Sequence, residues 1–335
     1  MRVRGIAAAL FAVVPLFAQS GGVVGSGSSQ PAPVSVAPGQ IVTFFVDGVP
    51  PVGPLRAKGG TPLPTELAGI TATVRQGSDK PAPIVEVRPV STCPDLVNIP
   101  EQNLCGTLTA VTVQIPYELR PFCPLCLTLF QSPAQLIVSA NGKSAASIEL
   151  NPLADQVHIL KSCDVSLQQF GSPQPLNTTG LPCPPMVTHA DGTLVSASSP
   201  AQIGEALTAW AFGLGQTDPP ANTGQVAATA ARALEQFYLD FNYSVNALPT
   251  KPFTGRPDVK PPKPDYAGLA PGTVGLYQIN FTVPDQPTGG TPRCPLPGTG
   301  APGADVVQSN LTVSIGGQFS FDGAGICVGT RIPVD

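Results

Sequence analysis

The sequence has few charged residues, few aromatic residues and almost no histidine. Charged side chains make up 11% of the 335 residues, against roughly 25% in typical soluble proteins. Aromatic residues account for 6%, with one tryptophan, and there are two histidines. The formal net charge is −4 and no basic run occurs. The chain therefore offers no basic surface that would neutralise the phosphates of a nucleic acid.

Beyond its N-terminus the sequence also lacks a long apolar run. A helix that crosses a bilayer needs roughly 20 apolar residues, and the run "IAAALFAVVPLFA" at 6–18 is shorter. It follows Arg2 and Arg4, a pattern typical of a secretory signal peptide. We expect residues 1–18 to be a signal peptide cleaved near Ala18, with an uncleaved anchor as the alternative, and 19–33 to be a flexible leader. A secreted or cell-surface location follows.

Glycine, proline and alternating apolar residues are abundant instead. The chain has 35 glycines, 41 prolines and 42% apolar residues. Apolar residues at every second position are typical of strands with one buried face. Short strands of this kind, separated by Gly/Pro turns, predict an all-β protein made of antiparallel sandwiches.

One layout of strands occurs twice. The first copy comprises the strand-like segments 36–49, 70–77, 81–90, 108–116 and 134–150, and the second comprises 200–215, 237–245, 266–284 and 309–328. "NG" at 141–142 and "GG" at 316–317 fall between alternating runs, and we expect tight hairpin turns there because such positions need positive φ. The layout predicts one sandwich over 34–160, a connector over 161–199 and a second sandwich over 200–335.

Two segments depart from the strand pattern. The Ala-rich stretch 224–236 is the one plausible helix, with a loop leading into the next strand as the alternative. The Pro/Lys-rich insertion 248–265 is expected to be an exposed, partly extended loop.

Several of these segments resemble a known family. The run from "THADGTLVSASSPAQIGE" to "TAWAFGLGQTDPPANTGQ" (188–225), then "YAGLAPGTVGLYQINFTVP" and "NLTVSIGG", is similar to duplicated immunoglobulin-like modules at the C-terminus of large secreted proteins of soil bacteria. "VAPGQIVTFF", "PLPTELAGITATV" and "VTVQIP" carry the likeness more loosely in the first half. The resemblance implies two immunoglobulin-like sandwiches in tandem outside the cytoplasm, with no established enzymatic activity. The eight cysteines depart from the common form.

The cysteines predict a disulfide framework. They are Cys93, Cys105, Cys123, Cys126, Cys163, Cys183, Cys294 and Cys327. An even number behind a secretion signal is typical of disulfides, although eight cysteines allow 105 pairings. Short loop closure favours Cys93–Cys105, Cys163–Cys183 and Cys294–Cys327, which leaves Cys123–Cys126. A redox site at "CPLC" (123–126) and a zinc site shared with the first two cysteines are alternatives, but the "CPLC" segment lacks a βαβ context and the zinc set lacks a second C-x₂-C.

Other catalytic or metal-binding patterns are weak. His189 with Asp191 and the serines at 196, 198 and 199 suggests a Ser/His/Asp arrangement, but no G-x-S-x-G elbow occurs, and "HADG" fits a turn. His158 lies in an alternating run and is expected to be a packing residue. "LPGTG" (296–300) resembles a sorting signal but precedes a core strand. Scattered aspartates near strand ends form no calcium-binding ladder.

The sequence therefore predicts a non-enzymatic secreted or surface protein without catalytic residues, cofactor or resident metal. Its expected role is structural, adhesive or in assembly, with strand edges or loops contacting a protein or glycan at the cell envelope. The alternative is a ligand-binding module, for glycans or a metal, in the groove between the two halves or on the 248–265 loop. Most aromatic residues, Trp210 among them, are expected in the core, and Tyr238 and Tyr266 are the candidates for exposed ligand contacts.

Overall fold

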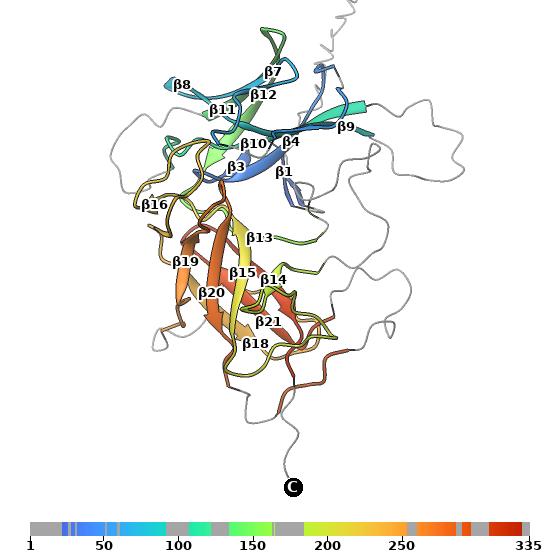
Figure 1. Cartoon of the computed structure of the whole chain (residues 1–335), viewed down its shortest axis with the longest axis vertical. Coiled ribbons are helices and arrows are strands. Elements are labelled where there is room, and N and C mark those ends of the chain that lie inside the picture. Colours follow the sequence, from blue (N-terminus) through green and yellow to red (C-terminus); the bar gives the residue numbers. More distant parts are fainter. Residues whose placement is uncertain are drawn as a thin grey trace, which may run out of the picture.

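The all-β prediction is confirmed. The computed structural model describes residues 22–25, 28–30, 32–50, 52–58, 61–91, 107–121, 134–162, 164, 184–252, 260–285, 290–295 and 308–329. Within these segments the chain forms strands and turns and no helix. The strands lie in two layered halves, one ending with residue 152 and the other beginning near residue 157 (Figure 1).

The N-terminal half contains two six-stranded sheets. Sheet 1 has the order β2–β1–β4–β10–β9–β5, with strands Ser28–Gln30, Gly22–Gly25, Ile41–Val46, Thr107–Gln114, Ile84–Ser91 and Leu55–Arg56. Sheet 2 has the order β3–β12–β11–β7–β6, with β8 paired to β7; its strands are Val34–Val36, Lys143–Pro152, Ala134–Ala140, Ile70–Gln76, Glu66–Leu67 and Ser78–Pro81. The pairings are antiparallel except that β3 runs parallel to β12.

The C-terminal half contains a seven-stranded and a three-stranded sheet. Sheet 3 has the order β13–β15–β20–β19–β17–β16, with β14 also paired to β15; its strands are His158–Ile159, Ala206–Phe212, Tyr277–Thr282, Tyr266–Leu269, Ala231–Ala233, Thr217–Asp218 and, for β14, Val187–Thr188. Sheet 4 contains β18, β21 and β22 (Tyr238–Asn242, Leu311–Gly316 and Phe321–Ile326). A parallel bridge joins Ala201 to Val328 beyond β22.

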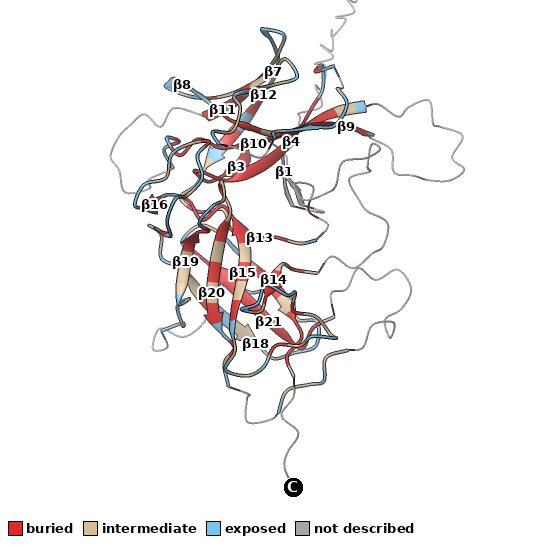
Figure 2. Cartoon of the chain, viewed as in Figure 1, coloured by how far each residue is buried: buried red, intermediate tan, exposed pale blue. Residues whose placement is uncertain are grey.

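Each half has its own apolar core between its two sheets. In the N-terminal half Phe44 of sheet 1 and Leu136 of sheet 2 are fully buried in one cluster. In the C-terminal half Ile279 of sheet 3 and Val313 of sheet 4 belong to a second cluster. Buried residues are concentrated in the strands of both halves (Figure 2). In β7 and β20 burial alternates as the sequence predicts, whereas β4 and β21 are buried along their whole length.

The turns at 141–142 and 316–317 need glycine for different reasons. At the β11–β12 hairpin Asn141 and Gly142 have φ of 49° and 77°, so this prediction is confirmed. The prediction of positive φ at 316–317 is wrong, since neither glycine is among the residues with positive φ. The β21–β22 loop instead surrounds Asp155, and a Cβ on Gly317 would lie 2.6 Å from the Asp155 carboxylate. Gly317 is needed for this close approach.

Residues 224–236 contain no helix. They form turns and the short strand β17 instead. The pairing of β17 with β19 gives the backbone an alternative set of hydrogen bonds, and an Ala-rich segment without an apolar stripe has little to favour a helix.

The described ends of the 248–265 insertion are mainly exposed, as the sequence predicts, but two of its prolines pack against sheet 4. Pro252 is buried, and a Cβ on Gly316 would lie 2.8 Å from its ring. A Cβ on Gly323 would lie 2.4 Å from Pro249. Glycines on the outer face of sheet 4 thus leave room for these prolines. Residues 253–259 lie outside the described residues.

The boundaries between the parts also differ from the expectation. Val157 and Ile159 belong to the C-terminal core, and β13 and β14, expected in the first sandwich and the connector, both pair with β15. In the leader, expected to be flexible, β1 pairs with both β2 and β4. The signal segment 1–18 lies outside the described residues.

Candidate functional site

A cavity of about 440 Å³ lies between the two halves. The described residues that line it come from both halves and are mainly apolar: Ile41, Arg56, Leu63, Val85, Leu160, Met186, Trp210, Phe212, Thr273, Val274 and Leu276. We call this cavity the central groove. Its size lies within the range of small-molecule pockets.

The groove follows from the alternation along β15. Leu207, Ala209 and Ala211 point into the C-terminal core. Trp210 and Phe212 therefore lie on the opposite face of sheet 3, where they form an apolar cluster with Ile41 of β4. Trp210 is therefore half-buried and packs against this cluster rather than inside the C-terminal sandwich, because β15 directs Ala209 and Ala211 into the C-terminal core.

The polar groups of the groove wall are already bonded, with one exception. Nε1 of Trp210 donates to Oγ1 of Thr188 at 3.2 Å, and the Thr273 hydroxyl donates to the carbonyl of Ala270 at 2.7 Å. Arg56 is exposed at the edge of the groove, on β5. Among the described residues, no carboxylate oxygen lies within 4 Å of its guanidinium. Arg56 is therefore the polar group that remains open to a ligand.

A buried charge lies beside this arginine. Glu86 is directly opposite Arg56 in the β5–β9 pair, is 1% exposed, and neither of its carboxylate oxygens has a hydrogen-bond partner. Nε of Arg88 lies 3.6 Å from Oε1 of Glu86. Burial raises the pKa of Glu86, although Arg88 and Arg56 oppose the shift.

The two walls of the groove are held together by a polar junction around Tyr117. Its side chain is buried in the C-terminal core although it follows β10 of the N-terminal half. Its backbone N–H donates to Oγ1 of Thr223 at 2.9 Å, and Nε2 of Gln216 donates to its carbonyl at 3.3 Å. The N–H of Gly224 donates to Oε1 of Gln114 at 2.6 Å. These bonds fix the spacing of the walls.

His189 lies between a serine and a carboxylate. Its Nε2 is 3.3 Å from Oγ of Ser199, and its Nδ1 is 2.5 Å from Oε1 of Glu205. This is the order of groups in a catalytic triad, with Glu205 in the place expected for Asp191. Asp191 instead accepts from the N–H and hydroxyl of Thr193 at the turn tip, as the turn reading of "HADG" predicts.

Two contacts of this trio favour a structural role. The hydrogen bond with Glu205 raises the pKa of His189, as a carboxylate partner does in a catalytic triad as well, so this shift does not distinguish the two roles. Nε2 also lies 3.2 Å from the carbonyl oxygen of Ser199, which requires an N–H donor. The N–H of Ser199 is bonded to Oγ of Ser196 at 3.1 Å and is not open to an oxyanion. None of the three residues lines the central groove.

The other histidine is more than a packing residue. His158 is 7% exposed; its Nε2 is 2.8 Å from Oδ2 of Asp164, and its Nδ1 is 3.3 Å from Oδ2 of Asp322. Burial alone would lower the pKa of His158, but the hydrogen bonds to the two carboxylates outweigh it and raise the pKa to about 9. The cation joins β13 to the edge strand β22.

Tyr238 and Tyr266 are not free platforms for a ligand. The Tyr266 hydroxyl donates to the carbonyls of Ala231 and Leu269, and the Arg232 guanidinium lies 5.0 Å from the ring centre. The Tyr238 hydroxyl is bonded to Gln236, and Nζ of Lys263 lies 5.7 Å from its ring. A cation covers a face of each ring, and neither ring lines the central groove.

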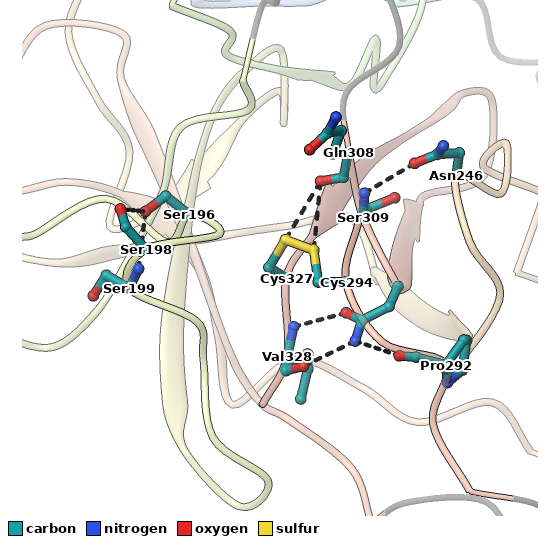
Figure 3. The surroundings of a disulfide bond; sticks show 11 residues. Ser196, Ser198, Ser199, Asn246, Pro292, Cys294, Gln308, Ser309, Cys327 and Val328 are labelled. Carbon is teal, nitrogen blue, oxygen red and sulfur yellow. Dashed lines mark hydrogen bonds between the residues drawn. A yellow bond between two sulfur atoms is a disulfide. The ribbon is translucent and has the colours of Figure 1, made fainter. Parts of the chain in front are cut away.

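The disulfide Cys294–Cys327 is present and fastens the segment before β21 to the end of β22 (Figure 3). It is one of the pairings favoured by loop closure. Beside it, Nδ2 of the buried Asn310 donates to the carbonyls of Pro292 and Val328, each at 2.8 Å, and its Oδ1 accepts from the N–H of Val328 at 2.7 Å. The other six cysteines and "LPGTG" lie outside the described residues.

Within the described segments, no group of three or more His, Cys, Asp or Glu side chains is placed to hold a metal ion. No helix in that part of the chain has the length and hydropathy needed to span a membrane. No protein-family model matches the chain, and no curated protein is similar to it.

Sequence reasoning missed the chemistry that depends on distant partners. Asp322, the second partner of His158, and the partners of Asp155 lie about 160 residues away in the sequence, and the alternation pattern carries no signal for them. Trp210 was detectable in principle, because "TAWAF" is apolar on both faces of a strand. A strand with two apolar faces has a second surface to cover.

Proposed function

We propose that the chain is a secreted, non-enzymatic binding protein made of two immunoglobulin-like modules. The strand order supports this assignment. In the C-terminal half β13–β15–β20–β19 and β18–β21–β22 correspond to the A-B-E-D and C-F-G sheets of a constant-type immunoglobulin domain. In the N-terminal half β4–β10–β9 and β7–β11–β12 correspond to B-E-D and C-F-G.

A shared irregularity favours a duplication. β3 runs parallel to β12, the last strand of the N-terminal half, and Ala201 forms a parallel bridge to Val328 after β22. In both halves the segment that precedes strand B of the sandwich, which is β4 in one half and β15 in the other, therefore pairs in parallel with the last strand or the residue that follows it. This is the arrangement expected if one module was copied, as the similarity of "LIVSANG" to "LTVSIGG" suggests.

The observation that carries the binding function is the central groove. Apolar surface that faces a cavity rather than a core is typical of small-molecule sites. Two of the ligands expected from the sequence fit it poorly, because a glycan needs polar partners along its length and a metal needs clustered ligands. We therefore propose an apolar ligand.

The proposal excludes catalysis by the His189 trio. A full-length oxidised chain should hydrolyse p-nitrophenyl acetate no faster than its Ser199→Ala variant. A rate that falls at least tenfold in this variant, while His158→Gln leaves it unchanged, would revive a hydrolase.

Binding is tested with the tryptophan of the groove. The chain contains one tryptophan, Trp210, so a saturable change in its emission on titration with decanol reports occupancy. Val274→Asp places a charge in the groove wall and should weaken the binding at least tenfold. The matched control Val245→Asp, at an exposed valine that does not line the groove, should leave it unchanged. No saturable change with any apolar probe would contradict the binding function.

A structural or assembly role is the second candidate, and one observation favours it. In the described part of the chain, residues 143–149 of β12 pair with β11 alone, since β3 reaches only Leu150, Asn151 and Pro152. An open edge accepts a strand from a partner. Capture of envelope proteins that is lost in Ser144→Lys/Ser147→Lys, but kept in Ser78→Lys on β8, would support this role.

A further inference from the structure

We infer that the central groove selects amphiphiles with one anionic head group, such as a carboxylate at the end of an alkyl chain. This inference rests on the proposed binding function and names the class of its ligand. It follows from the position of the one charged residue, Arg56, among the described residues that line an otherwise apolar cavity.

The apolar walls of the groove favour a ligand with an apolar chain. Ile41, Leu160 and Phe212 are between 3% and 6% exposed and belong to one cluster with the partly buried Trp210 and Met186. Removing apolar surface of a ligand from water against such walls is favourable by about 25 cal/mol per Å². A flexible thioether beside an aromatic ring adapts to chains of different shape.

The polar groups of the groove wall determine which head group the ligand carries. The indole N–H and the Thr273 hydroxyl of the wall donate to protein oxygens. An acceptor on a ligand would therefore form no additional hydrogen bond with them. Arg56 is exposed, and a guanidinium binds a carboxylate through two parallel hydrogen bonds. A neutral head would leave this cation without a partner, and a cationic head would repel it.

The neighbouring Glu86 does not cancel this preference. It lies directly opposite Arg56 in the β5–β9 pair, so the two side chains share one face of sheet 1, and Nε of Arg88 lies 3.6 Å from Oε1 of Glu86, which leaves two guanidinium groups beside one carboxylate. Burial raises the pKa of Glu86, although Arg88 and Arg56 oppose the shift. The Arg56 guanidinium is exposed and therefore faces solvent and the groove, whereas the Glu86 carboxylate does not.

The experiment compares three probes with the same ten-carbon chain: decanoate, decanol and decyltrimethylammonium. Each is titrated below its micellar concentration into the full-length oxidised chain, with Trp210 emission and calorimetry as readouts. We expect decanoate to bind at least tenfold more tightly than decanol, and the ammonium probe to bind most weakly. Arg56→Gln should weaken decanoate about tenfold and leave decanol unchanged. Arg120→Gln, at an exposed arginine outside the groove, is the matched control.

The outcomes separate the two proposals. Equal binding of decanoate and decanol, unaffected by Arg56→Gln, would overturn the anionic selectivity and leave the binding function in place. Absence of saturable binding by every probe would overturn both, including the case in which another part of the chain or a second copy fills the groove. If another part of the chain or a second copy fills the groove, Trp210 emission of the wild type should not respond to the probes.

Discussion

The hydroxyl oxygens of Tyr117 and Tyr277 lie 3.3 Å apart inside the C-terminal core, although Tyr117 belongs to the N-terminal half. The Tyr277 hydroxyl also donates to the carbonyl of Gly215. Gly39, with φ of 76°, leaves room for the Tyr117 ring, since a Cβ there would lie 2.2 Å from it. The Tyr117 side chain therefore anchors the N-terminal half in the core of the C-terminal half.

Removing this side chain should uncouple them. Tyr117→Ala leaves a cavity in the C-terminal core and should lower the free energy of unfolding by about 3–5 kcal/mol. Tyr117→Phe removes only the hydroxyl and should cost about 1 kcal/mol. Denaturant unfolding is followed by Trp210 emission, which reports the contact between the halves, and by circular dichroism for the whole chain.

The control is Tyr243→Phe, which loses the hydrogen bond to Pro284 within the C-terminal half but does not touch the junction. We expect the two unfolding signals to coincide in this variant and to separate in Tyr117→Ala. Coincident transitions in Tyr117→Ala would mean that the junction does not couple the halves.

The strands were predictable because their information is local. In β11 and β21 apolar residues alternate over six or seven positions, and "NG" marks the hairpin after β11. Period-two burial and positive φ are properties of neighbouring residues, so they are visible in the sequence. The pairing of strands into one sheet or another depends on distant segments, and β13 and β14 were accordingly assigned to the wrong part of the chain.

The sequence predicts where the candidate site lies but not which residues form it. A groove between the halves was expected, but its residues were not, because they derive from segments between Ile41 and Leu276 that only the fold brings together. Tyr238 and Tyr266 were chosen for residue type alone. Their rings are covered by Lys263 and Arg232, contacts that connect residues 25 and 34 positions apart and leave no periodic signal.

The turn around Asp155 should be intolerant of a side chain at Gly317. The Asp155 carboxylate is fully buried and accepts from the N–H groups of Gln318, Phe319 and Ser320 at 2.8–3.0 Å. Asp155→Ala leaves these donors unsatisfied and should cost about 3 kcal/mol. Gly317→Ala drives a methyl group into the carboxylate and should cost about 1–3 kcal/mol.

A double-mutant cycle identifies the cause. If the clash is with the carboxylate, Gly317→Ala should cost less in the Asp155→Ala background than in the wild type. Gly53→Ala, where nothing lies within 4 Å of the added Cβ, is the neutral control. Additive losses would show that the strain arises elsewhere in the turn.

The disulfide should contribute substantially to stability. It closes a loop between residues 33 positions apart, for which the loss of chain entropy in the unfolded state is about 3–4 kcal/mol. Cys294→Ala/Cys327→Ala should therefore lower the denaturant midpoint without changing the native circular dichroism. A loss below about 1 kcal/mol would mean that the Asn310 bonds hold this end of the sheet without the disulfide.

The pair of carboxylates around His158 should make stability fall at alkaline pH. The pKa of His158 is about 9 in the folded chain and about 6.5 when unfolded. A raised folded pKa means that the stabilisation is fully present below pH 6.5 and is lost as the pH rises through 9. The loss is on the order of 3 kcal/mol, measured as the free energy of unfolding between pH 6.5 and 9.

His158→Gln should lower stability at pH 6.5, because it removes the cation that contacts both Asp164 and Asp322, and should flatten the decline toward pH 9. His189→Gln, at the more exposed histidine, is the matched control and should keep most of the slope, since a cation near the surface is stabilised less by its partner. An unchanged slope in His158→Gln, or its disappearance in His189→Gln, would assign the alkaline loss of stability to another group.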